Sequence, residues 1–248
     1  MPDGAFAIGQ VEVRDVGKVY EGKRALLAVS HTFCAGQITA LLGENGAGKS
    51  TLLGVLGLQI RPTQGTLFFN GQAAASLNGE WLRGQLSLLS HKTRLYADLT
   101  ARENLLFFSQ LYLSDKTASE RENRATQWLR QVGLTHAADR TCRTFSRGMS
   151  QRLAIARALL HEPNVLLLDE PFSGLDQEGV ELLRSLIVQQ RARGSLIVVV
   201  SHDFEPLAQG LDQALVLRKG RVEKTASFEP GQCSRERLLS LYRGSNET

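Results

Sequence analysis

The fold of this chain is decided by the stretch Gln37-Ile38-Thr39-Ala40-Leu41-Leu42-Gly43-Glu44-Asn45-Gly46-Ala47-Gly48-Lys49-Ser50. Its first part, up to Leu42, predicts a short apolar strand. The rest matches the pattern G-x-x-x-x-G-K-[ST], whose glycines let backbone N–H groups point into one small space. A helix then begins near Lys49 and presents its positive end to an anion. Strand, glycine-rich loop and helix in this order predict a site that holds phosphate groups.

Two side chains of this loop have chemistry of their own. Lys49 can reach the β- and γ-phosphates of a nucleotide, and the Ser50 hydroxyl can ligate Mg²⁺. The residues expected to bind the nucleotide are Gly43, Glu44, Asn45, Gly46, Ala47, Gly48, Lys49, Ser50 and Thr51.

The composition is that of a globular α/β protein. The chain has 248 residues, of which 42% are hydrophobic, and a formal net charge of +4. These values suit one domain with a sizeable core, or one domain with an inserted lobe. The mild positive charge is compatible with a membrane surface or an acidic partner, and no dense basic run marks a nucleic-acid-binding arm.

The sequence shows neither a secretion signal nor a membrane-spanning run. Residues Met1-Pro2-Asp3-Gly4 lack the positive and apolar regions of a signal peptide. The longest apolar runs, such as Leu196 to Val200, have strand length, far below the ~18 residues that span a bilayer. We expect a soluble protein that reaches a membrane only through a partner. The widely spaced Cys34, Cys142 and Cys233 are expected to be buried apolar side chains in a reducing compartment.

Hydrophobic periodicity divides the chain into alternating strands and helices. Strands are expected at 11–16, 26–33, 37–42, 66–69, 165–168 and 195–200, followed by a short meander over 214–222. Helices are expected over 99–133, from about 149 to 163, 179–193 and 234–242. Thr100 and Glu103 have capping-box spacing at the start of the first helix. The helical stretch from about 90 to 160 is therefore interpreted as a lobe inserted in one nucleotide-binding domain of residues 1–248, with a short tail from about 226 to 248.

Four further segments carry polar groups where chemistry is expected. Asp169 and Glu170 follow a buried strand, so that Asp169 can bind the Mg²⁺ shell and Glu170 can polarise an attacking water. The segment Phe145 to Arg152 combines a serine hydroxyl, a glycine N–H and a helix N-terminus into a second anion site. Ser173-Gly174-Leu175-Asp176 follows the two carboxylates, and His202 ends another strand, where it could contact a γ-phosphate.

The order and spacing of these segments resemble the ATP-binding-cassette (ABC) ATPases from about Val11 to Val222. The resemblance implies an α/β fold: a P-loop NTPase (RecA-like) core with an antiparallel β subdomain and an inserted α-helical subdomain. It also implies that two copies close head-to-tail around two ATP molecules, and that neither site is complete in one chain. The residues matched to family roles are Tyr20 (adenine stacking), Gly43 to Thr51 (phosphate loop), Ser50 and Asp169 (Mg²⁺), Glu170 (catalytic base), Ser146 and Gly148 (signature), Asp176 (D-loop) and His202 (switch histidine).

Two segments depart from the family pattern. The signature, usually L-S-G-G-Q, has Arg147 in place of its first glycine and Met149 in place of its glutamine. His91 stands where most members have the Q-loop glutamine, which binds Mg²⁺ or the attacking water, so His91 is an expected catalytic residue with a titratable charge. Together with the stretch Leu99 to Leu105, these departures resemble the ATPase subunit of the haem exporter of cytochrome c maturation.

The resemblance implies an ATP-hydrolysing subunit that drives integral membrane permease subunits from the cytoplasmic face of the membrane, with haem as the expected cargo. The alternative is the ATPase of another bacterial ABC exporter, for a lipid, drug or lipoprotein. A soluble ABC protein acting on nucleic acid or ribosomes usually has tandem cassettes, zinc insertions or long coiled coils, which this sequence lacks, so no nucleic acid is expected as a partner. A module that holds ATP without turnover is disfavoured by Glu170 and His202.

Overall fold

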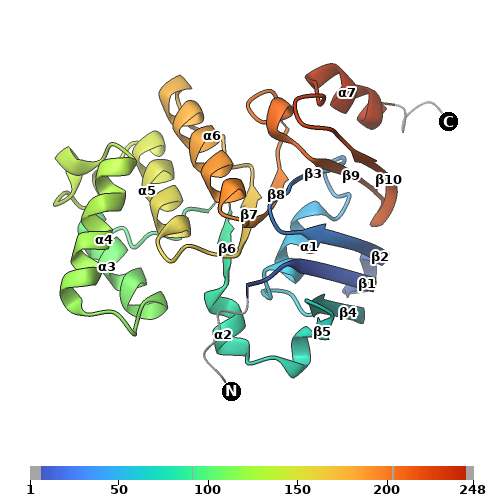
Figure 1. The fold of residues 1–248 in the computed structure, drawn as a ribbon, viewed down its shortest axis with the longest axis horizontal. Coiled ribbons are helices and arrows are strands. Elements are labelled where there is room, and N and C mark those ends of the chain that lie inside the picture. The colour runs from blue at the N-terminus through green and yellow to red at the C-terminus, as the bar shows by residue number, and fades with distance from the viewer. Residues whose placement is uncertain (1–6, 91, 203, 244–248) are drawn as a thin grey trace.

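The computed structural model describes residues 7–90, 92–202 and 204–243. Figure 1 shows a body of two sheets with their helices and, beside it, a lobe of helices that includes α3 (Ala101–Tyr112), α4 (Ala118–Gln131) and α5 (Arg147–Leu159). The strand β6 (Leu86–Leu89) lies between the two parts.

The larger sheet has six strands in the order β10-β9-β3-β8-β7-β6. Its other strands are β3 (Ile38–Leu42), β7 (Val165–Asp169), β8 (Leu196–Val200), β9 (Gln213–Arg218) and β10 (Arg221–Ser227). All neighbouring strands are parallel except β9 and β10. Because Val200 pairs with both Leu41 and Asp169, the loops after β3, β7 and β8 leave the sheet at one edge.

The smaller sheet is antiparallel and has the order β2-β1-β4-β5. Its strands are β1 (Gln10–Tyr20), β2 (Lys23–Cys34), β4 (Gln64–Phe69) and β5 (Gln72–Ala73). The helix α1 (Lys49–Leu56) packs between the two sheets, since Leu53 shares one apolar cluster with Val13 of β1 and Val198 of β8. The phosphate loop that precedes α1 is therefore held by both sheets.

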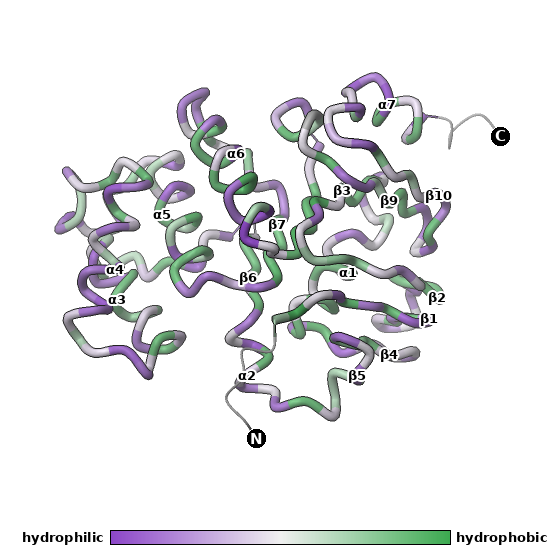
Figure 2. Tube along the Cα trace, in the orientation of Figure 1, coloured by the Kyte–Doolittle hydropathy of each residue, from purple (hydrophilic) through white to green (hydrophobic). Residues whose placement is uncertain are grey.

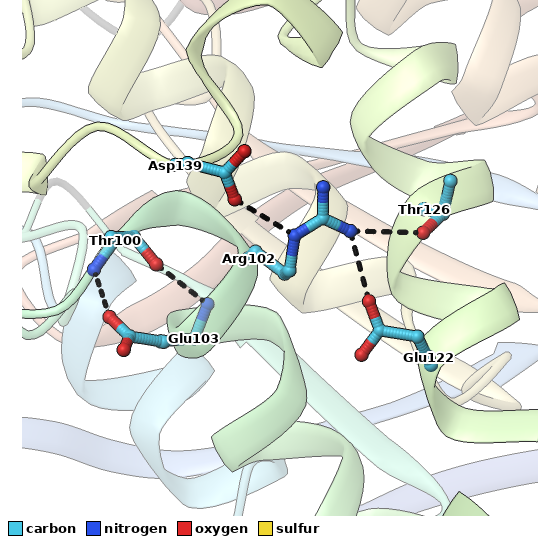
Figure 3. Close-up of polar contacts among 6 residues, drawn as sticks. All are labelled: Thr100, Arg102, Glu103, Glu122, Thr126 and Asp139. Atoms are coloured by element: carbon cyan, nitrogen blue, oxygen red, sulfur yellow. Dashed lines mark hydrogen bonds and ion pairs between the residues drawn. The ribbon is translucent and has the colours of Figure 1, made fainter. Parts of the chain in front are cut away.

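The helical lobe is built on two capping boxes. Thr100 accepts a hydrogen bond from the Glu103 backbone and Glu103 accepts one from the Thr100 backbone, which satisfies the first turn of α3 (Figure 3). Thr117 and Glu120 do the same for α4. Each helix therefore begins where its own sequence supplies the cap.

Arg102 joins the helices of this lobe (Figure 3). Its Nε donates to Asp139 at 3.0 Å, and its Nη1 donates to Glu122 at 2.9 Å and to Thr126 at 3.3 Å. Each ion pair is partly exposed to solvent, so each contributes at most about 1 kcal/mol. Their main effect is to fix the orientation of α3 against α4.

The remaining helices cover the edges and faces of the sheets. They are α2 (Gly79–Gly84), α6 (Gln177–Ala192) and α7 (Arg235–Arg243), with 3₁₀ turns at Ala74–Ser76, Thr135–Ala137, Cys142–Thr144 and Ala208–Gly210. Figure 2 shows hydrophilic and hydrophobic bands alternating along α6, as expected for a helix with one buried face. No helix within the described residues is both long enough and apolar enough to span a bilayer.

The structure confirms the predicted α/β fold with an antiparallel β subdomain. It also contains a lobe formed by α3, α4 and α5. One expected helix is wrong: the stretch 99–133 is broken after Tyr112, and α4 begins only at Ala118, because the second capping box starts a new helix there. The short elements β5, α2 and β6 were not expected, since they are too short to show a period.

Cys142 and Cys233 are buried as expected, and burial raises the pKa of each thiol to about 11; Cys34 is only half-buried.

Candidate nucleotide-binding and catalytic site

The Lys49 side chain folds back onto the phosphate loop. Lys49 is buried, and its Nζ donates to the carbonyl oxygens of Gly43 at 2.6 Å and Glu44 at 2.9 Å. Burial lowers the pKa of Lys49, while Glu170 and Asp169 oppose that shift by favouring the charged ammonium. The Lys49 ammonium group therefore lies against the backbone of the phosphate loop, and the Asp169 and Glu170 carboxylates favour its charged form.

Two glycines of the loop are required by close backbone contacts. Gly43 has φ +148° and Gly48 has φ +106°, both in the region that side chains disfavour. A Cβ at Gly43 would strike the carbonyl oxygen of Leu217 in β9, and one at Gly48 would strike that of Ala25 in β2. Backbone from both sheets therefore contacts the loop at these two glycines and restricts its conformation.

Glu170 stands directly after β7 in a strained conformation. Its φ is +51°, although it is not glycine, and its backbone N–H donates to Val200 at 2.8 Å. Its Oε2 accepts from the His202 backbone at 3.2 Å, and its Oε1 lies 3.4 Å from His202 Nε2. That Oε1 is buried and has no hydrogen-bond partner among the described residues. A carboxylate oxygen with a free lone pair at the sheet edge can accept a proton from water.

The donor set of this edge fits Mg²⁺ with ATP. Ser50 is exposed in the first turn of α1, and Asp169 is half-buried at the end of β7. Mg²⁺ takes oxygen ligands and usually needs only one or two from the protein, with the others from phosphate and water. Asp169 pairs with Val200 of β8, and Val200 also pairs with Leu41 at the end of β3, so the carboxylates follow the same sheet edge as the phosphate loop.

The signature segment forms a second cluster with the D-loop. Ser146 caps α5 by accepting from the Met149 N–H at 3.2 Å. Arg147 donates to Ser173 Oγ at 2.7 Å and lies against Gly174, so that a Cβ there would meet the Arg147 side chain. Ser146 itself is exposed. The arginine that replaces a signature glycine thus folds back over its own D-loop.

Asp176 has a structural role in this cluster. Its Oδ1 accepts from the Gly179 N–H at 2.8 Å, which caps α6, and from Arg152 Nη2 at 2.8 Å. These hydrogen bonds, first the one from Gly179 and then the one from Arg152, lower the pKa of Asp176. The carboxylate predicted to contact nucleotide is therefore already held by its own chain.

Two contacts made by residues of the signature stretch were not predicted from the sequence. The buried Gln151 donates from Nε2 to the carbonyl oxygen of Pro171 at 2.9 Å, which ties α5 to the segment after Glu170. Arg152 pairs with Asp176 and Glu178. Both residues lie inside the signature stretch, but their partners come from the segment after β7 and from the start of α6, so only the folded structure shows what they contact.

The expected site residues fall into separate groups. A cavity of about 360 Å³ beside the phosphate loop is lined by Gly43, Ser201, His202 and residues of α7. Ser146, Gly148 and Asp176 line no part of it and bond to no residue of the phosphate loop among the described contacts. Tyr20 is exposed at the end of β1, with Lys18 Nζ 5.0 Å from its ring centre. The expected catalytic His91 lies outside the described residues.

The other loop residues are distributed over the mouth and base of the loop. Glu44, Asn45 and Gly46 are exposed, Ala47 is buried, and Thr51 is half-buried on α1. The base is anchored by the Gly220 N–H, which donates to the Ala47 carbonyl at 3.0 Å.

Comparisons with known proteins identify the family. Residues 26–173 match the family described as ABC transporter. The ABC transporter ATP-binding protein NatA of Bacillus subtilis is 32% identical, over 88% of this chain and 90% of its own length. The bacitracin transport ATP-binding protein BcrA of Bacillus licheniformis is 33% identical, over 88% of this chain and 70% of its own length.

Solved structures agree with this match. The ATP-binding subunit of an ABC transporter superposes with a TM-score of 0.82 at 29% identity, covering 93% of this chain and 98% of that one. A dimeric ATP-binding cassette in a post-hydrolysis state, bound to ADP and Pi, superposes with a TM-score of 0.78 at 28% identity, covering 88% of this chain and 99% of that one. This chain belongs to the ABC transporter family and is one of its ATP-hydrolysing subunits.

Proposed function

We propose that two copies of this chain close around two ATP molecules and thereby drive a membrane permease from the cytoplasmic face. The observation that carries the proposal is the separation of the two anion sites. Ser146 is exposed at the N-terminus of α5 and bonds to no part of its own phosphate loop among the described contacts. A second copy turned head-to-tail would supply the nucleotide that this serine lacks. A structural relative is a dimer bound to ADP and Pi, which supports this arrangement.

Each residue of the first site has a definite task in this proposal. Lys49 leaves its carbonyl partners to bind the β- and γ-phosphates. Mg²⁺, held by Ser50 and Asp169, would neutralise charge on the phosphates. The free lone pair of Glu170 Oε1 accepts the proton of the attacking water, and His202 holds that carboxylate in position.

Glu170→Gln is the variant that tests the sandwich. The amide keeps the size of the side chain and loses the basic oxygen, so ATP binds and persists. With ATP and Mg²⁺, size-exclusion chromatography with light scattering should show twice the 27.3 kDa mass of the chain, while ADP should leave the monomer. Lys49→Ala/Glu170→Gln is the matched control, since it cannot hold the phosphates. A monomer at saturating ATP would contradict the proposal.

The cargo we propose is haem, exported for cytochrome c maturation. The support is the stretch Leu99 to Leu105 together with Ser146-Arg147-Gly148-Met149. The similar proteins NatA and BcrA are not named for haem export, and BcrA is named for bacitracin transport. Export of another compound is therefore the second candidate. Cells that carry Lys49→Ala in place of the wild-type chain should lose covalent haem staining of their c-type cytochromes. Unchanged staining would exclude the haem role and leave the ATPase assignment intact.

A further inference from the structure

The strained backbone of Glu170 needs support from the residues around it. Its φ of +51° lies in the left-handed region, which a residue other than glycine keeps only where its surroundings hold it there. On the N-terminal side the sheet gives this support, since Asp169 pairs with Val200 and the Glu170 N–H donates to the Val200 carbonyl oxygen. The segment 171–174 follows the end of β7, so its support has to come from another element.

Helix α5 holds this segment through two residues one turn apart. The buried Gln151 donates from Nε2 to the Pro171 carbonyl oxygen at 2.9 Å. Arg147, four residues earlier on the same face of the helix, donates from Nη2 to Ser173 Oγ at 2.7 Å. The Ser173 N–H in turn donates to the Glu170 carbonyl oxygen at 3.2 Å. Two hydrogen bonds through Ser173 therefore join Arg147 to the backbone of Glu170.

The space that the Arg147 side chain occupies is left open by Gly174. This glycine has a φ of +81°, and a Cβ on it would lie 2.5 Å from Arg147 Nε and 2.8 Å from Arg147 Cδ. Both distances are shorter than van der Waals contact, so the arginine lies where a side chain at position 174 would stand. Gly148 also approaches this point, since a Cβ on it would lie 3.5 Å from the Gly174 carbonyl oxygen. The first turn of α5 therefore packs directly on the segment after Glu170.

The guanidinium group of Arg147 has no competing partner. Within the described residues its side chain forms no ion pair and donates only to Ser173. Asp176, the carboxylate that follows the same segment, accepts instead from Arg152 and from the Gly179 N–H. Arg147 is exposed, and a single exposed hydrogen bond contributes little to the stability of a whole fold. We therefore expect its effect to be local, on the position of residues 171–174.

We propose that Arg147 is a positioning residue for the catalytic base of its own chain. Through Ser173 it holds the segment after Glu170, and so keeps the Glu170 carboxylate where it accepts a proton from the attacking water. A glycine, the usual residue at this place in the signature, has no side chain that could do this. The inference rests on the proposed role of Glu170 as the base and adds the residue that orients it.

The first test is a double-mutant cycle on the full chain. Arg147→Gln removes the guanidinium group, and Ser173→Ala removes its acceptor. Each change should lower kcat for ATP hydrolysis by about fivefold or more, because a small misplacement of the base is costly, while KM for ATP changes by less than about twofold. The double variant should be no slower than Arg147→Gln alone, since both changes break one contact. Arg147→Lys keeps a donor for Ser173 and should recover most of the lost turnover.

Arg140→Gln is the matched control for this cycle. Arg140 is also exposed, and its side chain also donates only to one neutral residue, Thr144, in the part of the chain that the structure describes. Its replacement should leave kcat at the wild-type value within about twofold. An unchanged kcat in Arg147→Gln, an equal loss in Arg140→Gln, or losses from Arg147→Gln and Ser173→Ala that multiply in the double variant would each overturn the proposal.

The second test asks which copy of a dimer needs Arg147. A mixture of Ser146→Arg with Lys49→Ala should contain dimers with one working site, in which the Ser146→Arg copy supplies the phosphate loop and Glu170. Adding Arg147→Gln to that copy should lower turnover by about fivefold or more. Adding it to the Lys49→Ala copy acts on a chain whose own site is already disabled, and should lower turnover by less than about twofold.

The outcomes of this mixing experiment separate the proposal from the function on which it rests. A loss only when Arg147→Gln is in the Lys49→Ala copy would mean that the arginine acts on the nucleotide of the other chain, and would overturn the proposal. Equal turnover with and without Arg147→Gln would refute the positioning role alone. A mixture that is inactive even with Arg147 intact would refute the shared site of the proposed function, and the double-mutant cycle would then decide the role of Arg147 by itself.

Discussion

Glu170, the proposed catalytic base, has a backbone conformation that suits glycine. Its φ of +51° lies in the left-handed region, which costs an ordinary residue roughly 1–2 kcal/mol. We therefore expect Glu170→Gly to be more stable than Glu170→Ala by about 1 kcal/mol, the reverse of the usual order. Urea unfolding of the two variants measures the difference, and both should be inactive. If the alanine variant is the more stable, the backbone is unstrained and the glutamate is not retained at a cost.

His161 gives the chain a stability that depends on pH. Its pKa is about 4 in the folded chain, below the ordinary 6.5, so between these values the unfolded chain binds more protons. Stability is therefore complete above pH 6.5 and is lost as the pH falls towards 4.

His161→Gln is the variant that isolates this effect. Between pH 6.5 and 5 the wild type should lose roughly 1.5 kcal/mol more unfolding free energy than the variant, because glutamine does not titrate. Urea titrations at both pH values measure this. Parallel losses in the two proteins would mean that His161 is not buried in its neutral form.

At the level of elements, the caps decide where the lobe helices begin. Thr100→Ala removes the side-chain acceptor of the Glu103 N–H, so the unfolding free energy should fall by about 1 kcal/mol. Thr100→Ser keeps the hydroxyl and is the control. ATP affinity should stay unchanged, because α3 contributes nothing to the phosphate loop. Equal stability of the serine and alanine variants would show that the cap does not hold α3.

The elements that sequence could predict are those with local signals. The apolar strands β3, β7 and β8 and the cap of α3 are each written in a few consecutive residues. Thr117 and Glu120 are a local signal of the same kind for the start of α4, but we predicted one continuous helix there. The short β6 had none, because its role depends on pairing with β7.

The site was predictable where a motif carries its own geometry. Gly43 and Gly48 need positive φ angles that the phosphate-loop pattern already demands. The hydrogen bond from Arg147 to Ser173 and the burial of Arg157 without an acceptor for its Nε–H could not be predicted, because each depends on how α5 packs against distant segments.

At the scale of the whole molecule, the proposed dimer would complete a nucleotide site whose parts one chain keeps apart. The phosphate loop with Glu170 and the exposed Ser146 are two half-sites that one chain does not bring together. In the proposed dimer each ATP lies between the phosphate loop of one copy and the signature of the other. A copy with a defective phosphate loop and a copy with a defective signature should therefore restore ATP hydrolysis when they form a mixed dimer.

Mixing Lys49→Ala with Ser146→Arg tests this most directly. In a mixed dimer one site carries both lesions, and the other combines an intact phosphate loop with an intact signature. Random pairing makes half of the dimers mixed, each with one intact site of two, so turnover should reach about a quarter of wild type while each variant alone is inactive. A mixture as inactive as its components would contradict a site shared between two copies.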